Sequence, residues 1–217
     1  GTFAIRPGPL LAASDFFEVM VQGKGGHGAM PAAAKDTTLA TAAIVMALQQ
    51  IVAREVPTFG AAVVSVTGIQ TDTMAHNVIP GSAKLTGTAR FFDKSIQEAV
   101  IHRINEVVTG TAAVYGCSAV LDYQFGVGIT ENNLGCTEHA IRAANSVAGA
   151  HQVQTDIELL MGGEDFSEML DARPGAFIFI GNGKSATLHH PEYNFNDEVI
   201  PNGCSWFAEL AEQRMPM

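Results

Sequence analysis

A glycine-rich segment carries the first side chain that could do chemistry, the imidazole of His27. The run GKGGHG at 23–28 has the spacing GxGxxG after a predicted strand, as a dinucleotide-binding loop does. The preceding strand is half polar, Pro31 follows at once, and no acidic residue ends the next strand at the required distance, so we reject dinucleotide binding. The segment is then a flexible turn that presents one histidine, and a lone histidine in a turn is usually an ordinary surface residue.

Two further pairs of residues could bind a metal ion. Glu164 and Asp165 follow a Gly-Gly pair, and His189 and His190 precede a proline. A catalytic divalent metal needs about three protein ligands. Because neighbouring side chains of an extended segment point to opposite sides, at most one of the two histidines should face a given metal. These residues alone predict only part of a metal site.

Composition excludes several classes of function. The 217 residues include 12 basic and 22 acidic side chains, a net charge of −10, which argues against a nucleic-acid partner. No run of about 18 apolar residues occurs, so we expect no membrane insertion. The three cysteines, Cys117, Cys136 and Cys204, are expected to be reduced core residues of a cytoplasmic protein.

The spacing of apolar residues predicts the elements that position these side chains. Alternation over 15–22, 82–92 and 119–125 predicts three strands, and the β-branched residues of 61–69 predict a fourth. Helical spacing predicts one helix that ends before Pro57, and a second that opens with a capping box formed by Ser95 and Glu98 and ends at Gly116. The order strand, helix, strand, strand, helix, strand is the split βαβ, ferredoxin-like order.

From about residue 131 onward, the pattern of apolar residues is different. A helix is expected at Thr137–Ala148, ended by Gly149. The run AFIFI at 176–180 has no alternation and predicts a strand covered on both faces. A last helix should open at Pro201 and bury the face formed by Cys204, Phe207, Ala208 and Ala211.

Five segments together resemble one family of metallopeptidases and amidohydrolases. They are RPGPLLAASDFFEV at 6–19, GKGGHGAMP at 23–31, HNVIPGSAKLTGTAR at 76–90, MGGEDFSEML at 161–170 and LHHPEYNFNDEVIPNG at 188–203. The family has co-catalytic metals and includes hippurate hydrolase, indoleacetyl-amino-acid hydrolases, carboxypeptidase G and succinyl-diaminopimelate desuccinylase. The resemblance covers nearly the whole chain.

This resemblance implies an α/β fold in which a ferredoxin-like dimerisation domain is inserted into a catalytic domain. Residues 15–126 then correspond to the dimerisation domain, residues 127–217 to the second part of the catalytic domain, and residues 1–14 to the end of its first segment. The implied assembly is a homodimer through the ferredoxin-like domain.

The resemblance also implies roles for residues of the inserted domain. In relatives, the histidine that His27 matches reaches across the dimer and polarises the scissile carbonyl of the substrate. The residues that Asn77 and Arg90 match help to hold substrate there. A guanidinium on the polar face of a strand suits capture of a free carboxylate.

In the last part of the chain, His189 matches a metal ligand of the family, and Glu164 and Asp165 match a loop beside the site. In relatives the other ligands and the general base precede the RPGPL segment. This chain has no Glu-Glu pair and no histidine before His27. The full centre, with zinc or manganese and two metals per subunit, is therefore expected only in a longer protein.

The function implied for that longer protein is metal-dependent hydrolysis of N-acyl amino acids, which are hippurate-like small-molecule amides. The present chain is expected to be an incomplete portion with little activity. The alternative is a non-enzymatic dimerisation or binding module that has kept the scaffold.

Overall fold

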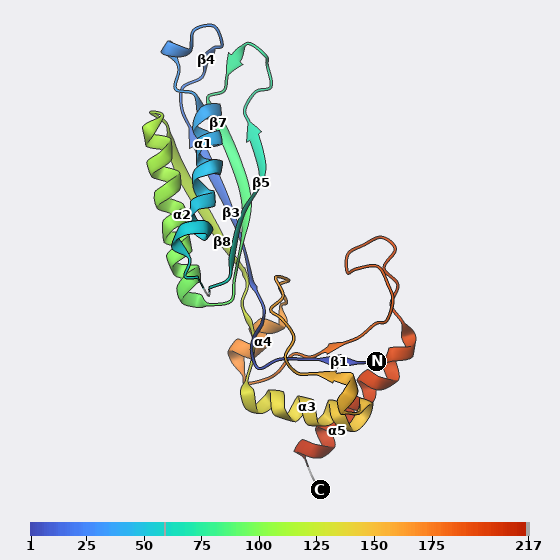
Figure 1. Ribbon diagram of the computed structural model, residues 1–217. Coiled ribbons are helices and arrows are strands. Elements are labelled where there is room, and N and C mark those ends of the chain that lie inside the picture. The colour runs from blue at the N-terminus through green and yellow to red at the C-terminus, as the bar shows by residue number, and fades with distance from the viewer. Residues whose placement is uncertain (59, 216–217) are drawn as a thin grey trace. The chain divides into compact units, whose positions relative to one another are not determined.

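The computed structural model describes residues 1–58 and 60–215, and these residues form two compact units (Figure 1). The first, here called the sheet unit, comprises Ala12–Ile129 with Met161–Gly163. The second, here called the terminal unit, comprises Gly1–Leu11, Thr130–Leu160 and the described chain from Glu164 onward. Each unit is described by itself.

The sheet unit contains four long strands and two long helices. Its strands are β3 (Ala13–Gln22), β4 (Gly26–His27), β5 (Ala62–Thr71), β6 (Val78–Ile79), β7 (Ser82–Phe91) and β8 (Ser118–Val127). Its helical elements are a 3-10 turn (Pro31–Ala33), α1 (Thr37–Gln50), a π turn (Ile51–Glu55) and α2 (Lys94–Val114). The predicted order of four strands and two helices is therefore observed.

The four long strands pair antiparallel in the order β5-β7-β3-β8. At the centre, Val19 of β3 pairs with Leu85 of β7 and Leu121 of β8. Ser14 pairs with Arg90 of β7 at one end of β3, and Gln22 pairs with Ser82 at the other. The short strands β4 and β6 form a separate ribbon beyond the Gln22 end, at the tip of the unit in Figure 1.

The helices α1 and α2 lie side by side on one face of the sheet (Figure 1). Phe17, Val19 and Val21 point toward them, as the alternation along β3 predicts. By length and mean hydropathy, the helical segment Thr37–Glu55 could cross a membrane. A core helix passes the same test, and Ile44 and its neighbours one turn apart are buried in this core.

The start of α2 differs from the prediction. Its N-cap is Asp93, whose Oδ1 accepts hydrogen bonds from the backbone N–H groups of Ser95 (2.7 Å) and Ile96 (3.3 Å). The prediction of a capping box formed by Ser95 and Glu98 was wrong, because the carboxylate of Asp93, two residues before Ser95, already accepts from these donors. A hydrogen bond from the Ser95 hydroxyl, followed by these two backbone bonds, lowers the pKa of Asp93.

The terminal unit is built from short strands and three helices. The strands are β1 (Phe3–Ala4), β2 (Gly8–Leu11), β9 (Thr130–Asn132), β10 (Val153–Gln154) and β11 (Phe179–Ile180). The helices are α3 (Leu134–Ala148), α4 (Phe166–Ala172) and α5 (Ile200–Arg214), with 3-10 turns at Ala150–Gln152 and Asp197–Val199. Gly149, at φ +80°, ends α3 as predicted.

The predicted strand at 176–180 is mostly absent. Only Phe179–Ile180 pairs, with β1, and the run is half-buried. The side chain of Asn132 bonds to the backbone of Phe177 instead. Its Oδ1 accepts a hydrogen bond from Phe177 N (2.6 Å), and its Nδ2 donates one to Phe177 O (3.0 Å). Since these backbone groups are satisfied by a side chain, no ladder forms there.

The buried face of α5 also differs from the prediction. Phe207 is 67% exposed and Cys204 is exposed, whereas Trp206 is 6% exposed and packs in the core of the unit. Trp206 Nε1 donates to Ala140 O of α3 (3.0 Å), so the indole N–H fixes which side of α5 faces inward. All three cysteines are free, but only Cys117 is buried.

Candidate functional site

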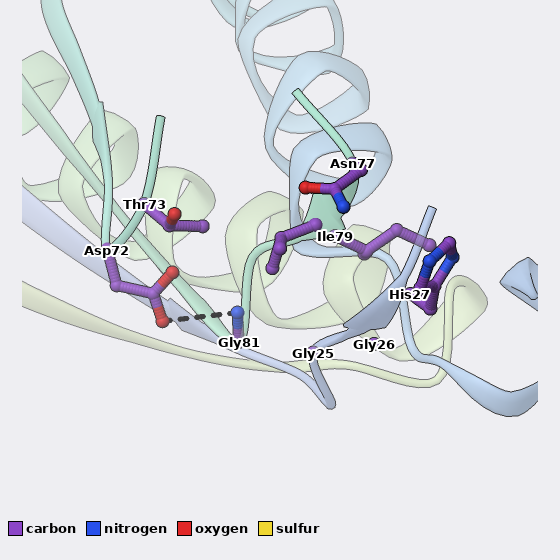
Figure 2. Close-up of a pocket in the computed structure, with 9 residues that line it drawn as sticks. Gly25, Gly26, His27, Asp72, Thr73, Asn77, Ile79 and Gly81 are labelled. Atoms are coloured by element: carbon purple, nitrogen blue, oxygen red, sulfur yellow. Dashed lines mark hydrogen bonds between the residues drawn. The ribbon is translucent and has the colours of Figure 1, made fainter. Parts of the chain in front are cut away.

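His27 and Asn77 lie together at the tip of the sheet unit, in a hollow of about 540 Å³ (Figure 2). His27 ends β4, and Asn77 precedes β6, with which β4 pairs. The Gly28 N–H donates to Asn77 O (2.7 Å), so the two segments run in contact. A Cβ on Gly25 would lie 2.9 Å from Ile79 O, which explains a glycine there by close approach of the backbones.

The ring of His27 has a defined tautomer. The backbone N–H of Ala29 donates to His27 Nδ1 (3.1 Å), so Nδ1 is an acceptor. A neutral imidazole carries one N–H, and this proton must therefore be on Nε2. Because the residue is exposed, Nε2–H is a hydrogen-bond donor available to a ligand. The turn thus prepares His27 to donate to an oxygen atom, such as a carbonyl.

Asp72 supports the hollow and was missed in the sequence. Its Oδ2 accepts from the backbone N–H groups of Gly81 (3.1 Å) and Ser82 (2.9 Å), and Asp72 and Thr73 line the side of the hollow away from His27 in Figure 2. The carboxylate ties the end of β5 to the start of β7. An aspartate in the loop that follows the strand predicted at 61–69 was the available signal.

Arg90 lies at the opposite end of the sheet from His27. It pairs with Ser14, and its guanidinium contacts the Ser14 hydroxyl and lies 5.9 Å from the centroid of the Phe16 ring. Arg90 lies eight residue steps along β7 from Ser82, roughly 26 Å at about 3.3 Å per residue. One chain therefore does not bring Arg90 to the hollow of His27 and Asn77.

A buried carboxylate next to Ser14 holds the Arg90 end of the sheet. Asp15 is 1% exposed and accepts from Tyr123 Oη (2.8 Å), Gln97 Nε2 (2.5 Å) and the Gly126 N–H (3.1 Å). These bonds join β3, β8 and α2. Burial, and then the hydrogen bond to Asp15, raise the pKa of Tyr123 far above its ordinary value, so this hydroxyl stays protonated as a donor.

The other three predicted site residues belong to the terminal unit. Glu164 is half-buried and its Oε1 accepts from Phe166 N (3.3 Å), while Asp165 is exposed at the start of α4. His189 is exposed and has φ +66°, in the left-handed region that a histidine rarely adopts. The neighbouring ring of His190 accepts from Glu192 N (3.1 Å) through Nδ1.

Within residues 1–58 and 60–215, no three His, Cys, Asp or Glu side chains gather closely enough to hold a metal ion. His189 presents an imidazole, but Glu164 and Asp165 do not complete a ligand set with it. The residues described here therefore do not by themselves fit a metal centre, and no chemical step is derived through one.

Comparisons with known proteins all point to one family. The model of Peptidase family M20/M25/M40 matches residues 3–213. The chain is 35% identical over 211 residues to N-acetylcysteine deacetylase of Bacillus subtilis, covering 97% of this chain and 54% of that protein. It is 30% identical over 209 residues to hippurate hydrolase of Campylobacter jejuni, covering 96% of this chain and 54% of that protein.

Solved structures agree with this result. The crystal structure of a dinuclear metal binding peptidase of the M20 family from Bacillus subtilis superposes with a TM-score of 0.79 at 30% identity, covering 97% of this chain and 52% of that one. The present chain thus spans about half the length of the relatives that it matches.

Proposed function

Because this chain belongs to peptidase family M20/M25/M40, we propose that it contributes to a metal-dependent amidohydrolase that cleaves N-acyl amino acids. The activity is assigned to a longer protein, in which zinc or manganese is bound by further residues together with His189. Residues 1–14 and 127–217 would belong to its catalytic domain. Hydrolases of small amides such as N-acetylcysteine deacetylase and hippurate hydrolase support the substrate class.

The observation that carries the proposal is the tautomer of His27. An oxygen that gains negative charge during amide hydrolysis is stabilised by a fixed donor aimed at it. Ala29 holds Nδ1 of His27 as an acceptor, which leaves Nε2–H free to donate to the scissile carbonyl. Asn77, in the same hollow, supplies an amide for a second polar contact with the substrate.

Arg90 is proposed to bind the free carboxylate of the substrate. Its guanidinium rests between the Ser14 hydroxyl and the Phe16 ring, which limit its rotamers. The distance between Arg90 and His27 along one sheet exceeds the length of an N-acyl amino acid. If both contact one substrate, they come from two different chains.

We therefore propose a homodimer through residues 15–126, the predicted ferredoxin-like dimerisation domain. The antiparallel order β5-β7-β3-β8 with both helices on one face supports that assignment. The three free cysteines are compatible with the proposed cytoplasmic location.

The test uses the longer protein that contains these residues. His27→Ala should lower kcat by roughly 10²-fold, as loss of an oxyanion donor does. Arg90→Ala should mainly raise KM, because it removes a contact made before and during reaction. A near-normal kcat in His27→Ala would contradict the catalytic role.

Mixing the two impaired variants, assayed with substrate far below KM so that both defects lower the rate, tests the arrangement in trans. In a heterodimer of His27→Ala with Arg90→Ala, one site has both wild-type residues if His27 acts across the dimer. Random exchange of subunits should then restore about a quarter of wild-type activity. If His27 and Arg90 act within one chain, each site keeps one defect and mixing restores nothing. No turnover by the unmutated protein would favour a non-enzymatic binding module.

A further inference from the structure

Three nitrogen-bearing side chains meet on the terminal unit where α3 packs against α5. Arg142 Nη2 contacts Nδ1 of His139, one turn earlier on α3. Arg214 Nη1, from the last turn of α5, lies 2.7 Å from Nε2 of the same ring. His139 is half-buried and both arginines are exposed. This group is here called the His139 cluster.

The packing of two helices holds the cluster in place. Trp206 is buried, and its bond to Ala140 O fixes α5 against α3 beside His139. Arg214 follows Trp206 by eight residues, about 12 Å along the helix axis, and so reaches the ring from a fixed direction. The meeting of the three side chains is thus tied to the core of the unit.

The hydrogen-bonding capacity of these groups does not match. A neutral imidazole has one N–H and one acceptor nitrogen, and a guanidinium only donates. Of the two contacts to His139, only one can therefore be a hydrogen bond, and the other sets two donors face to face. An acceptor from outside the cluster would satisfy the donors that remain.

The charge of the cluster points in the same direction. The chain has 12 basic and 22 acidic residues, yet the described residues supply no carboxylate ion pair to Arg142 or Arg214. Arg103, by contrast, contacts two carboxylates. Two guanidiniums that converge without a carboxylate create a local positive potential in an acidic protein.

The titration of His139 reflects its neighbours. Partial burial, followed by the charges of Arg214 and Arg142, lowers the pKa of His139, and Glu138 acts in the opposite direction. A dianion bound to the guanidiniums beside the ring would favour the protonated ring.

We propose that His139, Arg142 and Arg214 form a binding site for a phosphate-type oxyanion. His139 lies in contact with both guanidiniums, and the N–H groups of each guanidinium that do not face the ring can bind pairs of phosphoryl oxygens. The ligand is either inorganic phosphate or the phosphoryl group of a monoester. The site shares no residue with the proposed amide-hydrolysing site, so either proposal can fail alone.

The first test measures the histidine C–H resonances of the purified chain by NMR during pH titration. The resonance of His139 is identified with His139→Gln. At equal ionic strength, phosphate in place of chloride should raise the pKa of His139 in a saturable way and leave that of His102, exposed on α2, unchanged. No rise at His139, or an equal rise at both histidines, would overturn the proposal.

The second test removes the donors. Arg142→Gln and Arg214→Gln should each weaken phosphate binding by about tenfold, whereas Arg54→Gln, an exposed arginine of the sheet unit, should not change it. Unchanged affinity in both cluster variants would refute the site. Far-UV circular dichroism shows whether each variant folds. If one variant does not fold, the NMR titration of the unmutated chain still tests the site. Glycerol phosphate in a parallel titration separates the two sources, because the true ligand class binds more tightly.

Discussion

The sheet unit and the terminal unit differ in how much apolar surface each buries. Twenty of the described residues form the core cluster of the sheet unit, between ten-residue strands and two long helices. Six form the cluster of the terminal unit, where β1, β10 and β11 have two residues each. The sheet unit is thus held by many equivalent contacts, and the terminal unit by a few individual ones.

The largest effect is expected from Trp206→Ala. Loss of this side chain removes the largest member of the small core and its bond to Ala140, which should cost about 3–5 kcal/mol. Hydrogen exchange should accelerate in α3 and α5 and stay slow in β3 and β7. Met169→Ala, at a 65% exposed position of α4, is the control. Equal acceleration in both units would show that they unfold together.

A second substitution tests the other unit. Ile104 is fully buried in α2, and Ile104→Ala should cost about 2–5 kcal/mol. Since Trp206 is the only tryptophan, its fluorescence reports on the terminal unit, while far-UV circular dichroism reports on both. In urea, the dichroism transition should move further than the fluorescence transition. Val114→Ala, 81% exposed on the same helix, should move neither, and coincident shifts in Ile104→Ala would argue against separate units.

The smallest effect concerns the buried Asp15. Tyr123→Phe leaves this carboxylate with one donor fewer and should cost about 1–3 kcal/mol near neutral pH. Because the pKa of Tyr123 is higher in the folded state than its ordinary 10.0, the folded state keeps a proton that the unfolded state releases.

This difference sets the sign of the pH dependence. The contribution of Tyr123 is complete below pH 10.0 and falls as the pH rises above it, so wild type should lose stability more steeply than Tyr123→Phe in that range. Urea unfolding from about pH 8 to about pH 11 measures both slopes. Parallel slopes would mean that the hydroxyl titrates alike in both states.

The same contrast explains what the sequence could predict. Each long strand of the sheet unit has one face against helices, so apolar residues alternate along it and the elements can be read in order. In the terminal unit, Asn132 bonds to the backbone of Arg6 and Phe177, far away along the chain. A contact between a side chain and a distant backbone leaves no periodic pattern in the sequence. The sequence therefore predicted a longer strand at 176–180 than the structure has.

The candidate site shows a similar division. The motifs predict site roles for His27, Asn77 and Arg90, but a motif does not give the distances between these side chains. Only strand pairing places His27 beside Asn77 and sets Arg90 at the far end of β7. The protonated nitrogen of His27 likewise depends on one backbone contact in a turn, which the sequence does not encode in any recognisable spacing.

The pairing of Ser14 with Val127 on neighbouring strands has a consequence for the order of folding. The terminal unit pairs residues that precede the sheet unit in the sequence with residues that follow it, such as Phe3 with Ile180. In an unfolded chain, bringing residues 11 and 130 together requires closure of a loop of more than 100 residues, about 3 kcal/mol more than a short turn. Once β3 and β8 have paired, that closure is complete, so the sheet unit is expected to fold before the terminal unit.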